Sequence, residues 1–446
     1  MNRLCGYKFI ILSVMCFLDT AAAASSAHEI KLTSSFMNFA EIKNTDQDSH
    51  LDLNLEYKSE YFFSKKTKAN LSASAYVASY PDFVITLPEA DVVFSFGDSS
   101  VRVGRSKVKN VSYLDEDWFL GVQTAFLRMN PLYPEQQGRM GVTYRLESDQ
   151  VFAEFYGSPL SVPGQFPGFK VSDSGKVTSD NPWSRLPPEQ AVLTTGAELN
   201  LRYDVVDDSI PELVLDHQFG GALGVHTDYL RIVGMYSNRP SKQVDFLLDA
   251  KLQTGAESLV EIKTKPVFLR EHFFGVQAES KWFDGFTMKN GFYGLVLEDD
   301  ENPFKYQTSH PDYFFITTSL DLIIGKYEFL LQHLYTKERE NVQDDVIYIE
   351  SSRFLYKNAF SLVAKNIMYE KVKTNIGAIY SYKEENARFF IESSYVKSRN
   401  WSFFGRLNLI HTFDDEKNED GGLSISSGME SFAALDSINL GVSYVF

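Results

Sequence analysis

The sequence predicts an all-β fold: a transmembrane antiparallel up-and-down β-barrel of about 18 strands, with about 16 to 20 allowed. Three observations lead to this prediction. Apolar and polar residues alternate with period two along most of the chain, short and long connections follow one another, and the chain ends on an aromatic residue inside a strand pattern.

The alternation is clearest in the segment LDLNLEYKSEYF. Leu51, Leu53, Leu55, Tyr57 and Tyr61 share one face, and the other face carries Asp52, Asn54, Glu56, Lys58 and Glu60. Ser402, Arg406 and Asn408 continue the polar face in a later strand pattern, so we expect a water-filled lumen rather than a packed core.

Most segments of this kind span about 9 to 14 residues, longer than the usual strand of a soluble sheet and close to the length that a transmembrane strand needs. They lie near residues 30–42, 51–62, 69–79, 90–97, 139–146, 150–157, 219–236, 243–253, 257–267, 271–283, 286–297, 313–324, 326–336, 353–366, 370–382, 387–397, 401–413 and 438–446. The strand count depends on whether 219–236 is divided and on whether 83–97 is one strand.

The connections between these segments differ in length. Short turns such as ESDQ (147–150) and FDGF (283–286) alternate with long polar loops such as EDDENPFKYQTSHPD (298–312). Aromatic residues stand near the ends of two strand patterns, Trp282 beside Phe283 and Trp401 beside Phe403. This placement is typical of the aromatic girdles at the two membrane interfaces.

Residues 1–24 have the pattern of a secretory signal peptide. Arg3 and Lys8 are followed by the apolar run FIILSVMCFL and by the small residues TAAAASS. The apolar run is too short for a membrane-spanning helix, which needs about 20 residues. We therefore expect an exported chain whose barrel comprises residues 25–446.

Charge and cysteine content narrow the function classes. Both cysteines, Cys5 and Cys16, fall within the predicted signal peptide, so the exported chain has no disulfide with which to stabilise itself. The formal net charge is −16. A chain this acidic is not expected to bind nucleic acid, which requires a basic surface.

The last ten residues, SINLGVSYVF, resemble the C-terminal signal of bacterial outer-membrane β-barrel proteins. The resemblance implies that Tyr444 and Phe446 are read by the barrel-assembly machinery and that the last strand pairs with the first. It also implies a location in the outer membrane, in contact with lipid and lipopolysaccharide. Short turns would then be periplasmic and long loops extracellular.

Two long insertions interrupt the strand pattern, near residues 107–138 and 159–216. Both contain proline and glycine, which are poor strand residues. By resemblance to porins, one of them is a candidate constriction or plug inside the barrel. The alternative is an ordinary external loop.

Basic residues gather around the first insertion in spite of the negative net charge. If Arg102, Arg139 and Arg145 point inward, they oppose Glu147 and Glu154 and create a transverse field that favours anions or orients zwitterions and sugars. Contacts with lipopolysaccharide phosphates or salt bridges within the lumen are the alternative. The candidate selectivity residues are Arg102, Arg105, Arg128, Arg139, Arg145, Glu147 and Glu154.

Catalytic and metal-binding patterns are missing from the sequence. We find no nucleophile elbow, no zinc-protease motif and no phosphate-binding loop. The acidic loops LEDDENP and DDEKNED do not match the twelve-residue calcium loop. The sequence therefore predicts no enzyme, no cofactor and no metal.

The expected function is a porin-like channel that allows small hydrophilic solutes to diffuse passively across the outer membrane. One alternative is a barrel that exports a polysaccharide or another polymer. A second is a structural or adhesive barrel that conducts nothing. A homo-oligomer is possible, but the sequence carries no oligomer signature.

Overall fold

The computed structural model describes residues 26–38, 49–78, 83–107, 112–118, 124–126, 135–161, 170–178, 189–192, 198–205, 216–241, 245–253, 259–267, 269–298, 306–309, 312–339, 347–350, 356–369, 371–383, 385–413 and 436–445. The predicted signal peptide 1–24, Arg128 and Phe446 lie outside these described residues.

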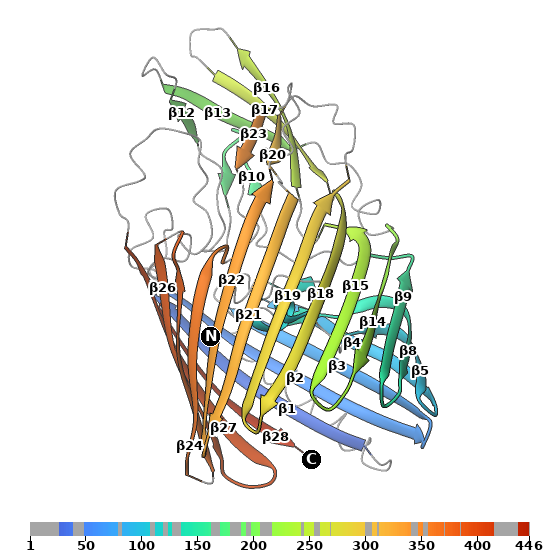
Figure 1. Ribbon diagram of the computed structural model, residues 1–446. Helices are drawn as coiled ribbons and strands as arrows, with labels where there is room; N and C mark the ends of the chain where they lie inside the picture. The colour runs from blue at the N-terminus through green and yellow to red at the C-terminus, as the bar shows by residue number, and fades with distance from the viewer. Residues whose placement is uncertain are drawn as a thin grey trace.

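One 18-stranded antiparallel sheet closes on itself to form a barrel (Figure 1). The last strand, β28, pairs with the first, β1, from Glu29↔Val445 to Asn38↔Asp436, which completes the ring. The strands follow one another around it in chain order: β1 (Ser26–Asn38), β2 (Ser49–Ser64), β3 (Thr67–Ala78), β4 (Phe83–Phe96), β5 (Ser99–Ser106), β8 (Arg139–Glu147), β9 (Val151–Ser158), β14 (Gln218–His226), β15 (Leu230–Pro240), β18 (Arg270–Phe283), β19 (Phe286–Leu297), β21 (Asp312–Ile324), β22 (Tyr327–Arg339), β24 (Ala359–Tyr369), β25 (Val372–Ser381), β26 (Asn386–Val396), β27 (Trp401–Thr412) and β28 (Asp436–Val445).

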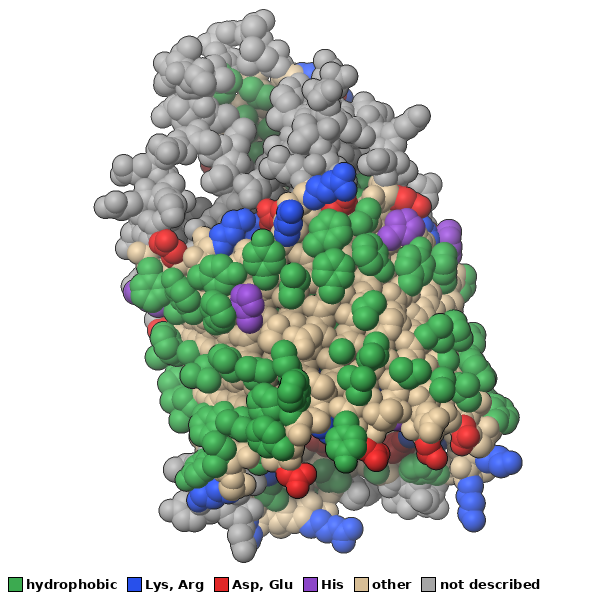
Figure 2. Space-filling model, in the orientation of Figure 1, with side chains coloured by type: hydrophobic (Ala, Val, Ile, Leu, Met, Phe, Trp, Pro, Cys, Tyr) green, Lys and Arg blue, Asp and Glu red, His purple; other side chains and the backbone are tan. Residues whose placement is uncertain are grey.

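The outer face of the barrel is apolar. Leu51 and Leu53 are exposed on β2, whereas Asp52 between them is buried on the inner side. The same alternation leaves Ile376, Leu440 and many other large apolar side chains uncovered. Figure 2 shows hydrophobic side chains spread over the side of the barrel that faces the viewer. Exposure of so much apolar surface is stable only where lipid rather than water surrounds it.

Aromatic side chains on the outer face stand at the ends of strands. Trp282 and Phe283 end β18, Trp401 begins β27 with Phe403 two residues further on, and all four are exposed. Rings at these positions reach the level at which the apolar core of a bilayer meets its headgroups.

The two ends of the barrel differ in the length of their connections. At the end where β1 begins and β28 ends, two residues suffice to join β4 to β5, β18 to β19 and β21 to β22. Gly97, Gly285 and Gly325 adopt φ angles of 65°, 89° and 60° in these turns. Glycine takes this left-handed conformation without steric cost.

Connections at the opposite end build a second sheet of six strands beyond the barrel (Figure 1). Two of its pairings, β13 with β17 and β20 with β23, are parallel. Its strands, in sheet order, are β12 (Gln190–Val192), β13 (Glu198–Val205), β17 (Leu259–Val267), β16 (Asp245–Gln253), β20 (Tyr306–Ser309) and β23 (Ile347–Glu350). A small hairpin, β10 (Lys170–Val171) and β11 (Val177–Thr178), contacts β13.

Several predicted strands are corrected by the structure. Segments 243–253 and 257–267 were expected in the barrel wall, but they form β16 and β17 of the second sheet. The division of segment 219–236, which the sequence left open, is settled as two strands, because β14 ends at His226 and β15 begins at Leu230. The segment near 90–97 is the second half of β4, β5 was not predicted, and β24 begins at Ala359 rather than near 353.

The outer face generates a test of membrane burial. Ile376 is 54 % exposed near the middle of β25, so Ile376→Arg places a cation in the hydrocarbon and should lower the free energy of unfolding by about 2–4 kcal/mol. Leu51, near the strand end, is the matched control: Leu51→Arg should lower it by at most about 1 kcal/mol. Denaturant unfolding in phospholipid vesicles measures both, and equal losses would contradict a membrane-spanning wall.

Candidate functional site: the barrel lumen

A row of polar side chains crosses the inner face of eight neighbouring strands from β2 to β22. Each member is the registered partner of the next in the pairing of adjacent strands, so the row runs across the wall at right angles to the strands. In order, the row is Asp52, Ser35, Asn439, Arg406, Glu392, Asn375, Lys365 and Glu328.

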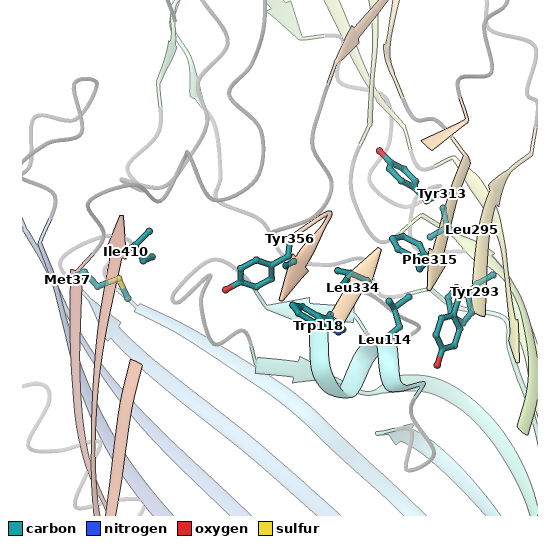
Figure 3. Packing of buried hydrophobic residues seen from close by; sticks show 12 residues of the cluster. Met37, Leu114, Trp118, Tyr293, Leu295, Tyr313, Phe315, Leu334, Tyr356 and Ile410 are labelled. Atoms are coloured by element: carbon teal, nitrogen blue, oxygen red, sulfur yellow. The ribbon is translucent and has the colours of Figure 1, made fainter. Parts of the chain in front are cut away.

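Part of the first insertion lies inside the barrel. Helix α2 (Tyr113–Trp118) lies between β5 and β8 in the sequence. Figure 3 shows its residues Leu114 and Trp118 pointing toward apolar residues of the wall. Both side chains are fully buried.

No helix among the described residues is long and apolar enough to cross a membrane.

Helix α2 is held against β18 and the strands that follow it. The Tyr113 backbone N–H donates to Oε1 of Gln277 at 3.2 Å, and the Tyr113 hydroxyl donates to Oε2 of Glu279 at 3.3 Å. At the other end of the helix, Trp118 meets the ring of Tyr356 edge-on, with centroids 5.9 Å apart. Tyr356 in turn accepts a hydrogen bond from Arg388.

The wall behind the helix is apolar, whereas the sequence analysis expected a water-filled lumen rather than a packed core. Inner-face residues of β18, β19, β21 and β22 are almost completely buried and belong to one apolar cluster with Leu114 and Trp118 of α2. The cluster comprises Met37, Leu114, Trp118, Phe273, Tyr293, Leu295, Tyr313, Phe315, Leu334, Tyr356, Ala359 and Ile410. The expectation was wrong here because these inner-face residues are buried in an apolar cluster that includes two residues of the inserted helix.

The end of the same insertion reaches a different wall. Strands β6 (Thr124–Phe126) and β7 (Glu135–Gln137) form a short hairpin, and Glu135 accepts hydrogen bonds from Ser74 of β3 at 2.6 Å and Thr86 of β4 at 2.8 Å. Five strands, β5, β8, β9, β14 and β15, separate β4 from β18 around the ring. The described parts of the insertion are therefore anchored to widely separated walls of the lumen.

A cavity of about 620 Å³ remains beside the insertion. It is bounded by Glu135 and by the inner faces of β1, β2, β3, β22, β24, β25, β26, β27 and β28, and every member of the polar row lines it. The charged residues on its surface are Lys31, Asp52, Glu135, Lys326, Glu328, Lys365, Lys373, Glu392 and Arg406.

Many of these charges are paired within the wall. Arg406 Nε lies 2.5 Å from Oε1 of Glu392, and Lys365 forms an ion pair with Glu328. Lys31 instead places its ammonium group over the ring of Phe404, 4.7 Å from the centroid. Among the described residues, Lys31, Lys326 and Lys373 have no carboxylate within 4.0 Å, the cut-off for a salt bridge.

No group of three or more His, Cys, Asp or Glu side chains that could hold a metal ion occurs in the described part of the chain. The cavity instead offers separate donors and acceptors of both signs. Such a lining can bind or orient polar solutes in water without chemistry on them.

Comparison with known proteins supports the fold. No protein-family model and no curated protein matches the chain. The solved structure of OccAB3 from Acinetobacter baumannii is similar with a TM-score of 0.50 at 9 % identity, over 95 % of this chain and 99 % of that one. At such low identity, this likeness shows the fold alone. The molecule is a transmembrane β-barrel of the bacterial outer-membrane type.

Two further structures cover the outer-membrane barrel to a similar extent with lower scores. OccK5 (OpdH) from Pseudomonas aeruginosa has a TM-score of 0.49 at 12 % identity, over 94 % of this chain and 98 % of that one. OmpT, an outer membrane protein of Vibrio cholerae, has a TM-score of 0.40 at 8 % identity, over 95 % and 97 % of the two chains.

The predicted basic cluster of the outer-membrane barrel lies on β5 and β8. Arg102 lies 3.2 Å from Oδ2 of Asp91 and 3.6 Å from Oε1 of Glu89. Arg105 donates to the Gly138 carbonyl at 3.1 Å and to Oε1 of Gln137 at 2.9 Å, which fixes the end of the insertion to β5.

The remaining members of the cluster occupy the adjoining wall. Arg139 is buried with its guanidinium 3.5 Å from the ring centroid of Tyr156, and Arg145 lies 2.5 Å from Oε2 of Glu147. The buried carboxylate of Glu154 is the cross-strand neighbour of Arg145. None of the predicted residues that the structure describes lines the 620 Å³ cavity.

The sequence analysis had placed Asp52, Asn54 and Arg406 on the lumen face, and they line the cavity. It missed Lys31, Lys373 and Glu392, although the parity of their strands would have indicated the inner face. It could not find Glu135, because this residue lies in an insertion whose path has no periodic signal. Near the end of β28, the ring of Tyr444 packs on Trp401, with centroids 4.7 Å apart.

Because α2 is buried against the wall, weakening its packing should release the insertion while the barrel stays folded. Trp118→Ala removes a fully buried side chain and should weaken the docking of α2 by about 3–5 kcal/mol, while the barrel remains closed. Trypsin should then cut the 107–138 insertion faster, with the barrel strands still protected. Trp401→Ala, at an exposed outer site, is the control. An unchanged cleavage rate in Trp118→Ala would show that this packing does not hold the insertion.

Proposed function

We propose that the chain forms a porin-like outer-membrane channel through which small hydrophilic solutes diffuse passively. The observation that carries this proposal is the polar cavity of about 620 Å³ inside the closed ring. Its volume is in the range of pockets that hold small molecules. Its lining of ammonium, guanidinium, carboxylate, amide and hydroxyl groups can replace the hydrogen bonds of a passing solute with water.

The 107–138 insertion is the proposed constriction. Its described segments contact β18 through Tyr113 and β3 and β4 through Glu135, so it occupies the lumen between these walls. The 159–216 insertion, in contrast, contributes β12 and β13 to the sheet beyond the barrel. Solute size would therefore be limited beside the first insertion rather than by the second.

The lining charges support a weak preference for anions. Two ion pairs, Arg406 with Glu392 and Lys365 with Glu328, cancel within the wall. Of the charged lining residues outside these two pairs, Lys31, Lys326 and Lys373 are positive, and Asp52 and Glu135 are negative. The cluster of Arg102 and its neighbours contributes less, because its members pair locally and do not line the cavity.

The partners follow from the location. Outer-membrane lipid covers the apolar face, and we extend the proposal to lipopolysaccharide in the outer leaflet. Tyr444 and Phe446 remain the proposed signal for the barrel-assembly machinery, with short turns in the periplasm and long connections outside.

Single-channel recording in a planar bilayer tests the channel. The purified protein should show steady ohmic openings, and deletion of residues 112–134 should raise their conductance by widening the lumen. A barrel that stays closed until 159–216 is deleted would favour polymer export instead. No current from either form would favour a non-conducting structural or adhesive barrel.

Ion preference should depend on the unpaired cavity lysines. Lys373→Glu replaces a lining cation by an anion and should shift the reversal potential in a salt gradient toward cation preference. Lys397→Glu is the matched control, since Lys397 is exposed in the turn after β26 and does not line the cavity. Equal shifts from both variants would mean that the cavity lining does not set the preference.

A further inference from the structure

Asp52 differs from the other acidic residues that line the cavity. Glu392 and Glu328 are paired with Arg406 and Lys365, and Glu135 accepts hydrogen bonds from two hydroxyl groups. Asp52 is only 4 % exposed, forms no salt bridge among the described residues, and its Oδ2 has no hydrogen-bond partner there.

The neighbours of Asp52 cannot neutralise it. Its registered partners are Ser35 on β1 and Ala78 on β3, and neither carries a charge. Ser35 is in hydrogen-bonding reach and satisfies part of the carboxylate. A buried carboxylate without a cation is costly, and an ionisable side chain at membrane depth is therefore a candidate functional group.

A second acceptor stands beside it. Asn54 follows on the same face of β2, about 6.6 Å along the strand, and its Oδ1 is likewise buried without a partner among the described atoms. Both residues line the cavity. Two acceptor oxygens without a partner among the described atoms therefore belong to side chains that line the same space, and one of these side chains is a carboxylate.

We propose that Asp52 and Asn54 form a subsite that binds the ammonium group of an aminated hydrophilic solute. An ammonium group carries three donors and a positive charge, so it can satisfy both oxygens and neutralise the carboxylate. A neutral hydroxyl would supply one donor and no charge. A hard metal ion would require six or more oxygen ligands, which this pair does not provide.

This subsite deepens the proposed channel function and rests on it for its biological meaning. Glucosamine and glucose are suitable probes, because they differ by one ammonium group and are small enough for the cavity. Saturation-transfer NMR on the detergent-solubilised full-length barrel measures their binding without any current. Channel recordings on the same preparation test conduction separately.

The wild-type barrel should bind glucosamine at least about tenfold more tightly than glucose, since a hydrogen bond to a charged group is the stronger kind. Asp52→Asn should remove that difference. Asp321→Asn is the matched control, because Asp321 is another lumen-side aspartate, outside the cavity lining, with a buried oxygen that has no partner. It should leave the ratio within about twofold.

Asn54→Asp, which adds a second carboxylate beside the first, should tighten glucosamine binding and leave glucose unchanged. Folding of each variant is checked by its heat-dependent migration on a denaturing gel. Equal binding of the two sugars by the wild type, or an equal loss in Asp52→Asn and Asp321→Asn, would overturn the subsite. Amine-selective binding without conductance would instead keep the subsite and reject the channel.

Discussion

The structure depends on one constraint: a backbone N–H or C=O in hydrocarbon must be paired within the protein, because no water is there to replace the lost hydrogen bond. Pairing of β1 with β28 meets this constraint by leaving the ring without an edge. The alternation of side chains then follows from the pleat. Every second residue meets lipid, which explains why Leu440 is 60 % exposed while its neighbour Asn439 is buried.

Closing a ring of 18 strands creates a second constraint, since its interior is wider than side chains can fill. The chain fills part of this space with its own insertion. An apolar cluster around Leu114 and Trp118 holds helix α2 of the insertion on one wall, and hydrogen bonds to Glu135 attach the end of the insertion to another. The open volume that remains lies against β22 to β28 and β1 to β3, where the lining is polar.

The sequence predicted the barrel and its strand number better than it predicted which segments form the barrel strands. The strand number was right, but for a compensating reason: β16 and β17 were counted in the ring, while β5 was missed and the division of 219–236 was left open. Alternation of apolar and polar residues indicates a strand with two unlike faces, but it does not indicate which sheet that strand belongs to. β5 escaped notice because it is short and contains Arg102, Gly104 and Arg105, with Gly104 at a φ of 122°.

Lumen residues could be predicted where the alternation along a strand fixes which face a side chain is on. They could not be predicted where the position of a side chain depends on the path of the insertion. Parity alone placed Asp52 and Arg406 in the lumen. Whether a lumen charge faces open volume depends on its cross-strand partners and on the insertion, which bring together residues far apart in sequence, such as Ser74 and Glu135.

Pairing within the wall determines which charges can act on a solute. In a low-dielectric wall, a charge pair such as Arg406 with Glu392 fixes two side chains and nearly cancels their field. A chain with a net charge of −16 can therefore present a lumen of almost balanced charge. In the proposed channel, a solute would meet the remaining charges, namely the lysines that have no carboxylate partner among the described residues and the buried carboxylate of Asp52. Selectivity in such a barrel is set by the few groups that the wall leaves unpaired, and the total number of charges in the lumen says little about it.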